Sequence, residues 1–495
     1  MNTNTPIPSP AAAAAATLPG DADADADSSV TLVSLYQKQR KIYARAVTGL
    51  FARWRWALVW FTQALFYGLP WLMWNERQAL LFDLVSRRFY IFGLVLYPQD
   101  LIYLSALLMI SAYALFLFTA VAGRLWCGYA CPQTVYTEIF MWIERKFEGD
   151  RQRRMKLDEG PWTFNKLWRK SSTQLAWIAV GLWTGFSFVG YFTPIRSLGA
   201  SVVSLGLGPW ETFWILFYGF ATYGNAGFMR EQVCKYMCPY ARFQSAMFDK
   251  DTLIISYDQG RGEPRGSRSK KADFKQLGLG ECVDCELCVQ VCPTGIDIRK
   301  GLQYECIGCA ACVDVCDGVM DKMGYPRGLV RYATQNGLAQ GFDRQQILRR
   351  ILRPRVLVYT AILWIILGAF AWSIAVRDPF RVDVVRDRSS LARVVDDGRI
   401  ENVYRLQVMN NAEQQQRYRF TVDGLPAMVI TDRAEVTLGP AEAQWFTLHV
   451  QLPFEGGRQA GAGAHAIHFE IERLPAHAGD RVVRLREKST FVVPR

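Results

Sequence analysis

The sequence predicts a multidomain fold: an α-helical membrane domain with five transmembrane helices, a cysteine-rich insertion, and a C-terminal all-β, immunoglobulin-like domain. Three observations predict it. Five apolar stretches are long enough to cross a bilayer, which takes about 20 apolar residues. Eight of the twelve cysteines lie between the fourth and fifth stretches. Short runs of alternating polar and apolar residues fill the chain after residue 380.

The five stretches contain no charged residue, and the chain as a whole is 51% hydrophobic, which excludes a disordered protein. We expect them to be helices at residues 56–74, 101–122, 174–195, 212–229 and 356–376. The run 79–97 is also apolar, but Asp83, Arg87 and Arg88 interrupt it. We interpret that run as an interfacial or re-entrant segment.

Lysine and arginine residues predict the orientation in the membrane. The segment 124–172 contains ten of them, whereas the connection 196–209 contains only Arg196. Loops rich in positive charge stay in the cytoplasm. We therefore expect the N-terminus, 124–172 and 231–355 inside, and the tail after residue 377 outside, in the periplasm. The net charge of +12 follows from these inner loops, so it indicates a lipid membrane and not nucleic acid as the partner.

The cysteine-rich insertion contains two similar blocks, "CVDCELCVQVCP" and "CIGCAACVDVC". Each reads C-x2-C-x2-C-x3-C, the spacing of bacterial-type ferredoxins with two [4Fe–4S] clusters, in which the fourth cysteine of each block binds the other cluster. Asp317 stands where that pattern has proline, and Gly295 and Gly308 suit close backbone approach to a cluster. The predicted ligands of one cluster are Cys282, Cys285, Cys288 and Cys316, and those of the other are Cys306, Cys309, Cys312 and Cys292.

Two other interpretations of these eight cysteines compete. Disulfides do not suit a loop in the reducing cytoplasm. A zinc site normally shows two separated CxxC pairs, and not two runs of four cysteines. Clusters are therefore the favoured interpretation.

The remaining four cysteines form two C-x3-C-P pairs, Cys127 with Cys131 and Cys234 with Cys238, each directly after an apolar stretch. If the two halves fold alike, the four thiols meet near the inner membrane face. Pro132 and Pro239 suit the first position of a helix, so Cys131 and Cys238 become helix caps, where partial positive charge favours a thiolate. Thiolates bind soft ions such as Cu(I). Simple packing of buried cysteines remains the alternative.

These features divide the chain into five expected regions. They are a disordered N-terminus at 1–33, a membrane domain with four helices at 34–249, a cytoplasmic ferredoxin-like domain at 250–345, the fifth helix at 346–377 and a periplasmic immunoglobulin-like domain at 378–495. The N-terminal region lacks the basic start and long apolar core of a cleaved signal peptide.

The histidines and the tail restrict the function further. All four histidines lie in the tail, so the apolar stretches offer no pair of haem ligands. His465 and His468 do not share a strand face, which argues against a metal site there. Tyr223 and Asn225, the polar residues of the fourth stretch, are open to a functional role or to bonds between helices.

The N-terminal "YQKQRKIYARAVTGLFARWRW", the boxes "WCGYACPQTVY" and "CKYMCPYARFQSAM", the double cysteine block and the tail resemble, over residues 31–495, the CcoG/FixG/RdxA family of cytochrome c oxidase accessory proteins. The resemblance implies a bacterial inner-membrane protein that helps to assemble a cbb-type oxidase and reduces Cu(II) to Cu(I) on the cytoplasmic side. It implies the eight cluster ligands above, and copper held at Cys127, Cys131, Cys234 and Cys238.

The resulting hypothesis is that electrons pass from an unknown cytosolic donor through two [4Fe–4S] clusters to copper, which then goes to oxidase-assembly proteins. Two alternatives stay open: a quinol dehydrogenase that feeds a periplasmic reductase, and a non-enzymatic assembly scaffold. The sequence does not distinguish a monomer from a homodimer.

Overall fold

The computed structural model describes residues 41–387, 392–395, 398–432, 434–475 and 482–494. The chain forms two compact units, 1–41 and 42–495, and all elements named below belong to the second. The predicted disordered segment 1–33 lies outside the described residues.

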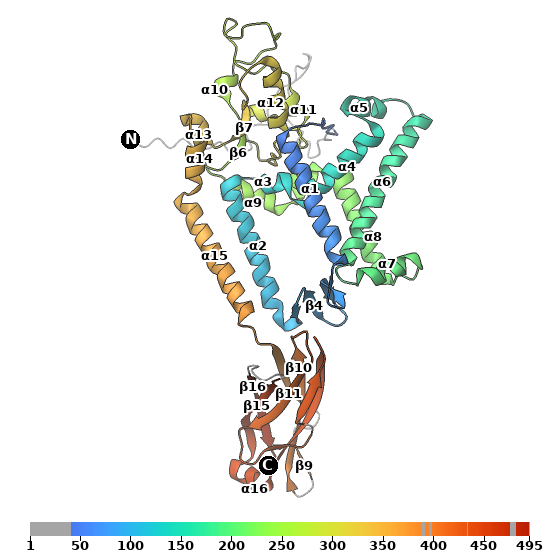
Figure 1. Cartoon of the computed structure of the whole chain (residues 1–495), viewed down its shortest axis with the longest axis vertical. Coiled ribbons are helices and arrows are strands. Elements are labelled where there is room, and N and C mark those ends of the chain that lie inside the picture. The colour runs from blue at the N-terminus through green and yellow to red at the C-terminus, as the bar shows by residue number, and fades with distance from the viewer. Residues whose placement is uncertain (1–40, 388–391, 396–397, 433, 476–481, 495) are drawn as a thin grey trace, which may run out of the picture. The chain divides into compact units, whose positions relative to one another are not determined.

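The first part of the second unit is mainly helical (Figure 1). Its helices are α1 (Leu50–Gly68), α2 (Leu101–Ala122), α3 (Leu125–Tyr129), α4 (Pro132–Glu148), α5 (Arg151–Glu159), α6 (Phe164–Val189), α7 (Ile195–Val203), α8 (Pro209–Tyr223) and α9 (Pro239–Met247). Two π-helical turns, η4 (Gly224–Met229) and η5 (Val233–Met237), join α8 to α9.

Helices occupy all five predicted stretches, but only two of the described helices are long and apolar enough to cross a membrane by that test alone: Pro98–Ala122, which includes α2, and Pro354–Ala375, which is α15. The prediction of five spans is not confirmed. Helix α1 starts early and includes Arg53 and Arg55, and α6 begins at Phe164 with a basic first turn. Helix α8 ends after 15 residues.

The apolar run 79–97 consists mainly of short strands, and its predicted interfacial or re-entrant position stays a prediction. It forms an antiparallel sheet of β3 (Leu80–Asp83), β4 (Arg88–Ile91) and β5 (Leu94–Leu96). The charged residues that break the run turn the chain, because Asp83 accepts hydrogen bonds from the backbone amides of Val85 and Ser86.

Helices α6 and α8 pack closely through glycine. A Cβ atom on Gly181 would lie 2.8 Å from the carbonyl oxygen of Gly219, and one on Gly185 would lie 2.2 Å from that of Ile215. Small residues that let two backbones approach are typical of helix pairs in membranes. Tyr223 donates a hydrogen bond of 2.7 Å to Gln174 across this pair, so its role is interhelical.

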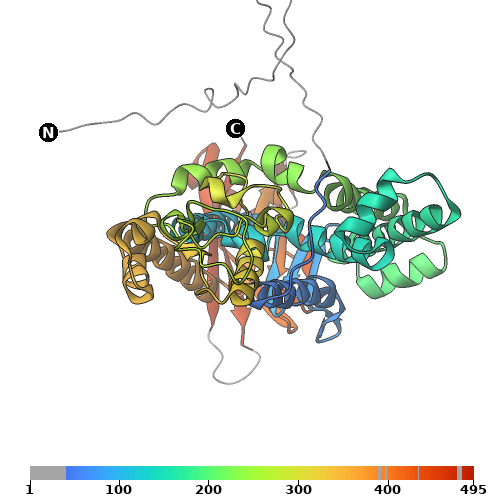
Figure 2. The same ribbon diagram turned by 90° about the horizontal axis from the view of Figure 1, so that it is seen from above.

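Helices α2 and α15 lie side by side, as Figures 1 and 2 show. Tyr103 meets Phe370, and Tyr113 meets Tyr359, with 6.1 Å between ring centroids in each pair. The outer surfaces of both helices are apolar and exposed, as expected of helices that face lipid.

The cysteine-rich region lies between α9 and α15 and contains little regular structure. A two-stranded sheet of β6 (Ile254–Tyr257) and β7 (Val330–Ala333) closes it. Its helices are α10 (Gln259–Gly262), α11 (Leu287–Gln290), η6 (Ile298–Lys300), α12 (Ala311–Met323), α13 (Gln335–Gln340) and α14 (Arg344–Ile351).

The tail is a sandwich of two antiparallel sheets, which confirms the immunoglobulin-like prediction. In one sheet β10 (Ile400–Asn410) lies between β8 (Phe380–Arg386) and β14 (Ala443–Leu452), with the short β9 (Arg393–Val394) and β12 (Val429–Ile430) at its edges. The other has the order β13 (Glu435–Leu438), β11 (Gln416–Asp423), β15 (Gly463–Leu474), β16 (Val483–Val493). Alternate residues such as Tyr404 and Phe469 fill the core between them.

Candidate metal centres

The two cysteine blocks fold into loops of the same shape. Asp284 and Gly308 occupy the third position of each block, with φ angles of 50° and 70°. Glu286 and Ala310 occupy the fifth, with φ angles of 56° and 57°. Non-glycine residues rarely adopt positive φ, so the repeated conformation indicates loops that wrap around a bound group. Such strain persists where the surroundings require it.

The first block and the end of the second face one another. Cys282, Cys285 and Cys288 line a single cavity together with Cys316, and the walls between them include Tyr257 and Met320. This is the set of four that the spacing predicts for one cluster. Cys285 is exposed, so this site lies at the surface of the cysteine-rich region.

The other four cysteines also lie near each other, deeper in the protein. Electrostatic interactions connect Cys309 to Cys292, and connect Cys312 to Cys306, Cys309 and Cys292. Cys309 is buried. The structure therefore places one candidate site at the surface and one inside.

The chemistry of these thiols fits iron–sulfur clusters. Burial raises the pKa of Cys288 to about 11 and that of Cys306 and Cys316 to about 12, so the thiols are neutral until a cation displaces their protons. Within the described residues, no three His, Cys, Asp or Glu side chains converge on a point that suits a single metal ion. Four thiols around one cavity match a [4Fe–4S] cluster, in which each thiolate binds its own iron.

The second cysteine block has Asp317 in place of the expected proline, because a helix continues through this position. Helix α12 begins directly after Ala310 and continues through Cys316 and Asp317, which proline would prevent. The Asp317 carboxylate accepts a hydrogen bond of 2.9 Å from the amide of Gly328. The departure alters the turn after the ligand and leaves the ligand set unchanged, as the sequence predicts.

The two C-x3-C-P pairs take the predicted positions at helix starts. Cys131 caps α4 and Cys238 caps α9, and a proline follows at the first helical position in both. The first cysteine of each pair differs in setting: Cys127 lies in α3, whereas Cys234 lies in the π-helical turn η5. Such π-helical turns are frequent at functional sites.

The structure brings these four thiols into one neighbourhood. Cys131, Cys127 and Cys238 each act electrostatically on Cys234. Burial raises the pKa of Cys127 to about 11, that of Cys234 to about 12, and that of Cys131 as well. At Cys131 the amides of Gln133 and Thr134 at the helix start lower the pKa, as the sequence predicts, but burial raises it by more.

Sequence reasoning missed two glutamines that organise the thiols. Gln244 on α9 is fully buried, and both atoms of its side-chain amide lie 3.5 Å from Sγ of Cys127. Gln133 follows Pro132 and donates hydrogen bonds of 2.9 and 3.0 Å to the carbonyl oxygens of Asn225 and Arg230. Gln133 thereby ties the first box to the segment that precedes the second. Both stand inside the boxes, which was the available signal.

Gly128 was also missed, and it joins the membrane-edge thiols to the inner cluster site. A Cβ atom on Gly128 would lie 2.8 Å from the Cα and N atoms of Cys309. Gly308 makes a matching approach, because its Cβ would lie 3.1 Å from the backbone of Arg124. The first thiol box and the second cysteine block therefore pack backbone against backbone, with Cys127 and Cys309 in one apolar cluster.

A carboxylate of the cysteine-rich region caps the first long helix. Asp314 on α12 accepts hydrogen bonds from the backbone amides of Phe51 (3.1 Å) and Ala52 (2.7 Å) at the start of α1. Gly49 provides no capping side chain, and a Cβ there would lie 2.3 Å from Cγ of Asp314. Asp314 thus replaces the missing cap and holds α12 on α1.

A buried ion-pair network fixes the approach to the second box. Glu144 on α4 is 2% exposed and accepts from Arg154 at 2.6 Å and from Arg230 at 2.7 Å. Arg230 has a φ of 39° and also donates to the carbonyl of Gly227. The network sets the turn between η4 and η5, and so the position of Cys234.

The fold and the sites define a class of protein: a membrane protein with [4Fe–4S] sites and a C-terminal immunoglobulin-like domain. Family profiles match three of its regions. They are a 4Fe-4S dicluster domain at residues 229–335, a 4Fe-4S binding domain at 104–149, and the IG-like fold at the C-terminus of FixG at 370–494.

Known relatives identify the family. "Nitrogen fixation protein FixG" of Rhizobium meliloti is 38% identical over 467 residues, which cover 86% of this chain and 89% of that protein. Protein RdxA of Cereibacter sphaeroides is 38% identical over 401 residues, or 79% and 84% of the two chains, and RdxB of the same organism is 38% identical over 424 residues, or 82% and 88%. The chain belongs to the FixG/RdxA family and is an iron–sulfur electron-transfer protein of that family.

Solved structures match only part of the chain. A FixG-related protein from Vibrio parahaemolyticus is 22% identical, with a TM-score of 0.20, over 23% of this chain and 97% of that one. At this score the likeness supports no structural conclusion.

Proposed function

We propose that the protein reduces Cu(II) to Cu(I) at Cys127, Cys131, Cys234 and Cys238, on the cytoplasmic side of a bacterial inner membrane, during assembly of a cbb-type cytochrome oxidase. Each Cu(II) ion takes up one electron, and the Cu(I) product is the form that soft thiolates hold well. The single observation that carries the proposal is the backbone contact of Gly128 with Cys309. It sets the thiol pair beside the inner cluster site.

In this proposal each group of four cysteines of the cysteine-rich region binds one cluster. Cys282, Cys285, Cys288 and Cys316 hold one [4Fe–4S] cluster, and Cys292, Cys306, Cys309 and Cys312 hold the other. When bound, such clusters supply carriers of single electrons. The exposed Cys285 gives a cytosolic electron donor access to the outer site, and burial around Cys309 excludes water from the inner one.

The proposed orientation includes five crossings. The glycine contacts between α6 and α8 support helices that meet inside a bilayer, and the basic residues of 124–172 support a cytoplasmic position for the thiol boxes. Helix α1 would cross alongside them. The immunoglobulin-like domain then lies in the periplasm, where it is available to oxidase-assembly or copper-delivery proteins.

Replacing the four membrane-edge cysteines with serine tests the site. We expect Cu(II) reduction by the dithionite-reduced protein to be lost, because serine hydroxyls bind Cu(I) poorly, while iron content and cluster absorbance stay unchanged. Replacing Cys285 with serine is the complementary variant and should alter the cluster spectrum. Full Cu(II) reduction by the four-serine variant would remove these thiols from the reaction.

Separate additions of quinol and of Cu(II) distinguish the proposal from its main alternative, a quinol dehydrogenase. A quinol dehydrogenase would show cluster reduction on addition of quinol without copper. A protein that reduces Cu(II) instead shows reoxidation of its reduced clusters when Cu(II) is added. A protein whose clusters accept no electrons from any physiological donor would instead be a scaffold.

A further inference from the structure

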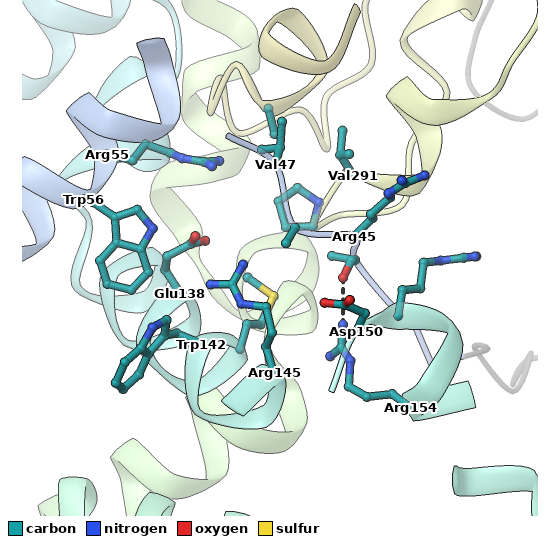
Figure 3. A pocket seen from close by; sticks show the side chains of 16 residues that line it. Arg45, Val47, Arg55, Trp56, Glu138, Trp142, Arg145, Asp150, Arg154 and Val291 are labelled. Atoms are coloured by element: carbon teal, nitrogen blue, oxygen red, sulfur yellow. Dashed lines mark hydrogen bonds between the residues drawn. The ribbon is translucent and has the colours of Figure 1, made fainter. Parts of the chain in front are cut away.

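A basic cavity lies where α1, α4 and α5 meet the cysteine-rich region. Its volume is about 60 Å³, and five arginines line it against two carboxylates, Glu138 and Asp150. Figure 3 shows Arg55, Arg145 and Glu138 extending from α1 and α4 toward the same space. Val291, Pro293 and Ala311 of the cysteine-rich region close another side. The cavity thus combines excess positive charge with contributions from two parts of the fold.

Two of the arginines are already used by the protein. Arg154 pairs with Glu144 and donates to the carbonyl of Ala44 at 2.7 Å, and Arg151 donates to the carbonyl of Tyr43 at 2.8 Å. The other three are Arg45, which is exposed, Arg145, which is half-buried, and Arg55, whose buried Nε atom has no hydrogen-bond partner among the described residues. Arg55 is only 6% exposed. Glu138 and Asp314 act electrostatically on Arg55 and balance part of its buried charge. Arginines still outnumber carboxylates in the lining, so the cavity suits an anion from outside the chain.

An apolar groove adjoins the basic cavity. It has a volume of about 760 Å³ and runs between α1, α4 and α6. Trp56 and Trp142 line both spaces, so the groove begins where the basic cavity ends. Tryptophan at such a boundary is typical of the membrane interface.

A single amide interrupts the apolar wall of this groove. Gln63 on α1 is 8% exposed, and its buried side-chain oxygen has no hydrogen-bond partner in the described part of the chain. Burying a polar atom without a hydrogen-bond partner costs free energy of folding. The ligand of the groove is therefore expected to be long and apolar, with a polar group near Gln63.

We propose that these two spaces form one binding site for an anionic diacyl phospholipid. The phosphate occupies the basic cavity beside Arg55 and Arg145, the acyl chains lie in the groove, and the glycerol ester region passes Trp56 and Trp142 toward Gln63. Basic pockets between helices at the cytoplasmic face are known to take anionic headgroups. The inference rests on the proposed crossing of the membrane by α1 and α6, and not on copper reduction.

The site gives the lipid a structural task. Its headgroup touches α1 and α4 on one side and the residues that flank Cys292 and Cys312 on the other. A bound lipid therefore holds the cysteine-rich region on the membrane domain, in addition to the cap that Asp314 provides.

Native mass spectrometry of the full-length protein tests the proposal, with delipidated protein titrated with phosphatidylglycerol or phosphatidylcholine. We expect phosphatidylglycerol to bind more tightly. The double variant Arg55→Gln/Arg145→Gln should weaken its binding by roughly 30-fold, since each basic residue at a membrane surface contributes about fivefold in affinity. The matched control Arg53→Gln/Arg153→Gln removes the same charge from exposed positions outside the cavity and should bind as the unaltered protein does.

Iron content is measured on each variant, so a misfolded variant is recognised independently of lipid binding. Equal binding of the two lipids would overturn the proposal. Displacement of bound phosphatidylglycerol by millimolar inorganic phosphate would also overturn it, because it would reveal a site for a soluble anion. Failure of copper reduction in these assays would leave the lipid result unaffected, since binding is measured without copper.

Discussion

At the scale of residues, burial controls the protonation of the thiols Cys127 and Cys234. The Cys127 and Cys234 thiols keep their protons at neutral pH, because burial raises the pKa to about 11 and about 12. Gln244 lies against Cys127 and adds no charge. The buried Arg124 acts on both thiols but does not offset the effect of burial. A metal must therefore displace these two protons, which favours a metal that binds sulfur strongly.

This protonation predicts how Cu(I) binding depends on pH. Each thiol that binds copper must release a proton, and protons compete better the further the pH lies below the raised pKa. Affinity should therefore fall as pH falls, by about tenfold per pH unit for each thiol that binds, over roughly pH 6 to 8. Competition titration with a Cu(I) chelator in the dithionite-reduced protein measures it. An affinity that does not change with pH would mean that copper binds elsewhere.

Individual residues also mark how far sequence reasoning reaches. The spacing of the cysteine blocks predicts which four cysteines share a cavity, because short spacers restrict which sulfurs can meet. Gln244 and Gly128 escaped notice, because their importance depends on which segments pack together. No pattern within one segment reports such packing.

At the scale of elements, the contact between α3 and the second cysteine block is the junction of the two sites. The variant Gly128→Ala places a Cβ atom 2.8 Å from the Cys309 backbone and must push the two apart. We expect slower reoxidation of the reduced protein by Cu(II) with iron content retained. The control Gly318→Ala lies in α12, where a Cβ meets nothing within 4 Å, and should behave normally. Unchanged kinetics in Gly128→Ala would show that the contact is irrelevant to the reaction.

The start of α1 depends on α12. The variant Asp314→Ala removes the acceptor for the Phe51 and Ala52 amides and should cost about 1 kcal/mol, the usual loss for a helix cap. Hydrogen exchange measured by mass spectrometry should show faster exchange at these two amides. Asp321→Ala, on the exposed side of the same helix, serves as the control. Equal exchange in both variants would argue that α1 does not need this cap.

Elements were predicted unevenly. Hydropathy located a helix at each of the five apolar stretches, but it missed the basic first turn of α6 and the early end of α8. It did not predict the strands of 79–97, because apolar residues pack in a sheet as well as in a helix. In the tail, strands β11 and β13 to β16 match the alternating runs. Strand β10 was not predicted, because residues on both its faces are buried and its sequence shows no clear alternation.

At the scale of the whole molecule, the order of sites suggests the direction of electron flow. The outer cysteine site has the exposed Cys285, the inner site has the buried Cys309, and the membrane-edge thiols adjoin the inner site. In the proposed function a cytosolic donor would reduce the first site, and copper would bind at the last. The cofactor class follows from the cysteine spacing and the family from the order of the motifs, whereas the proposed copper role rests on this spatial order.

An anaerobic titration shows whether electrons pass from iron–sulfur clusters to copper. Protein purified without oxygen is assayed for iron, reduced with dithionite and titrated with Cu(II), while cluster absorbance is followed. The account predicts about eight iron atoms per chain and reoxidation of one cluster for each Cu(II) reduced. Colourless protein, protein that carries zinc in place of iron, or reduced clusters that Cu(II) leaves unchanged would contradict it.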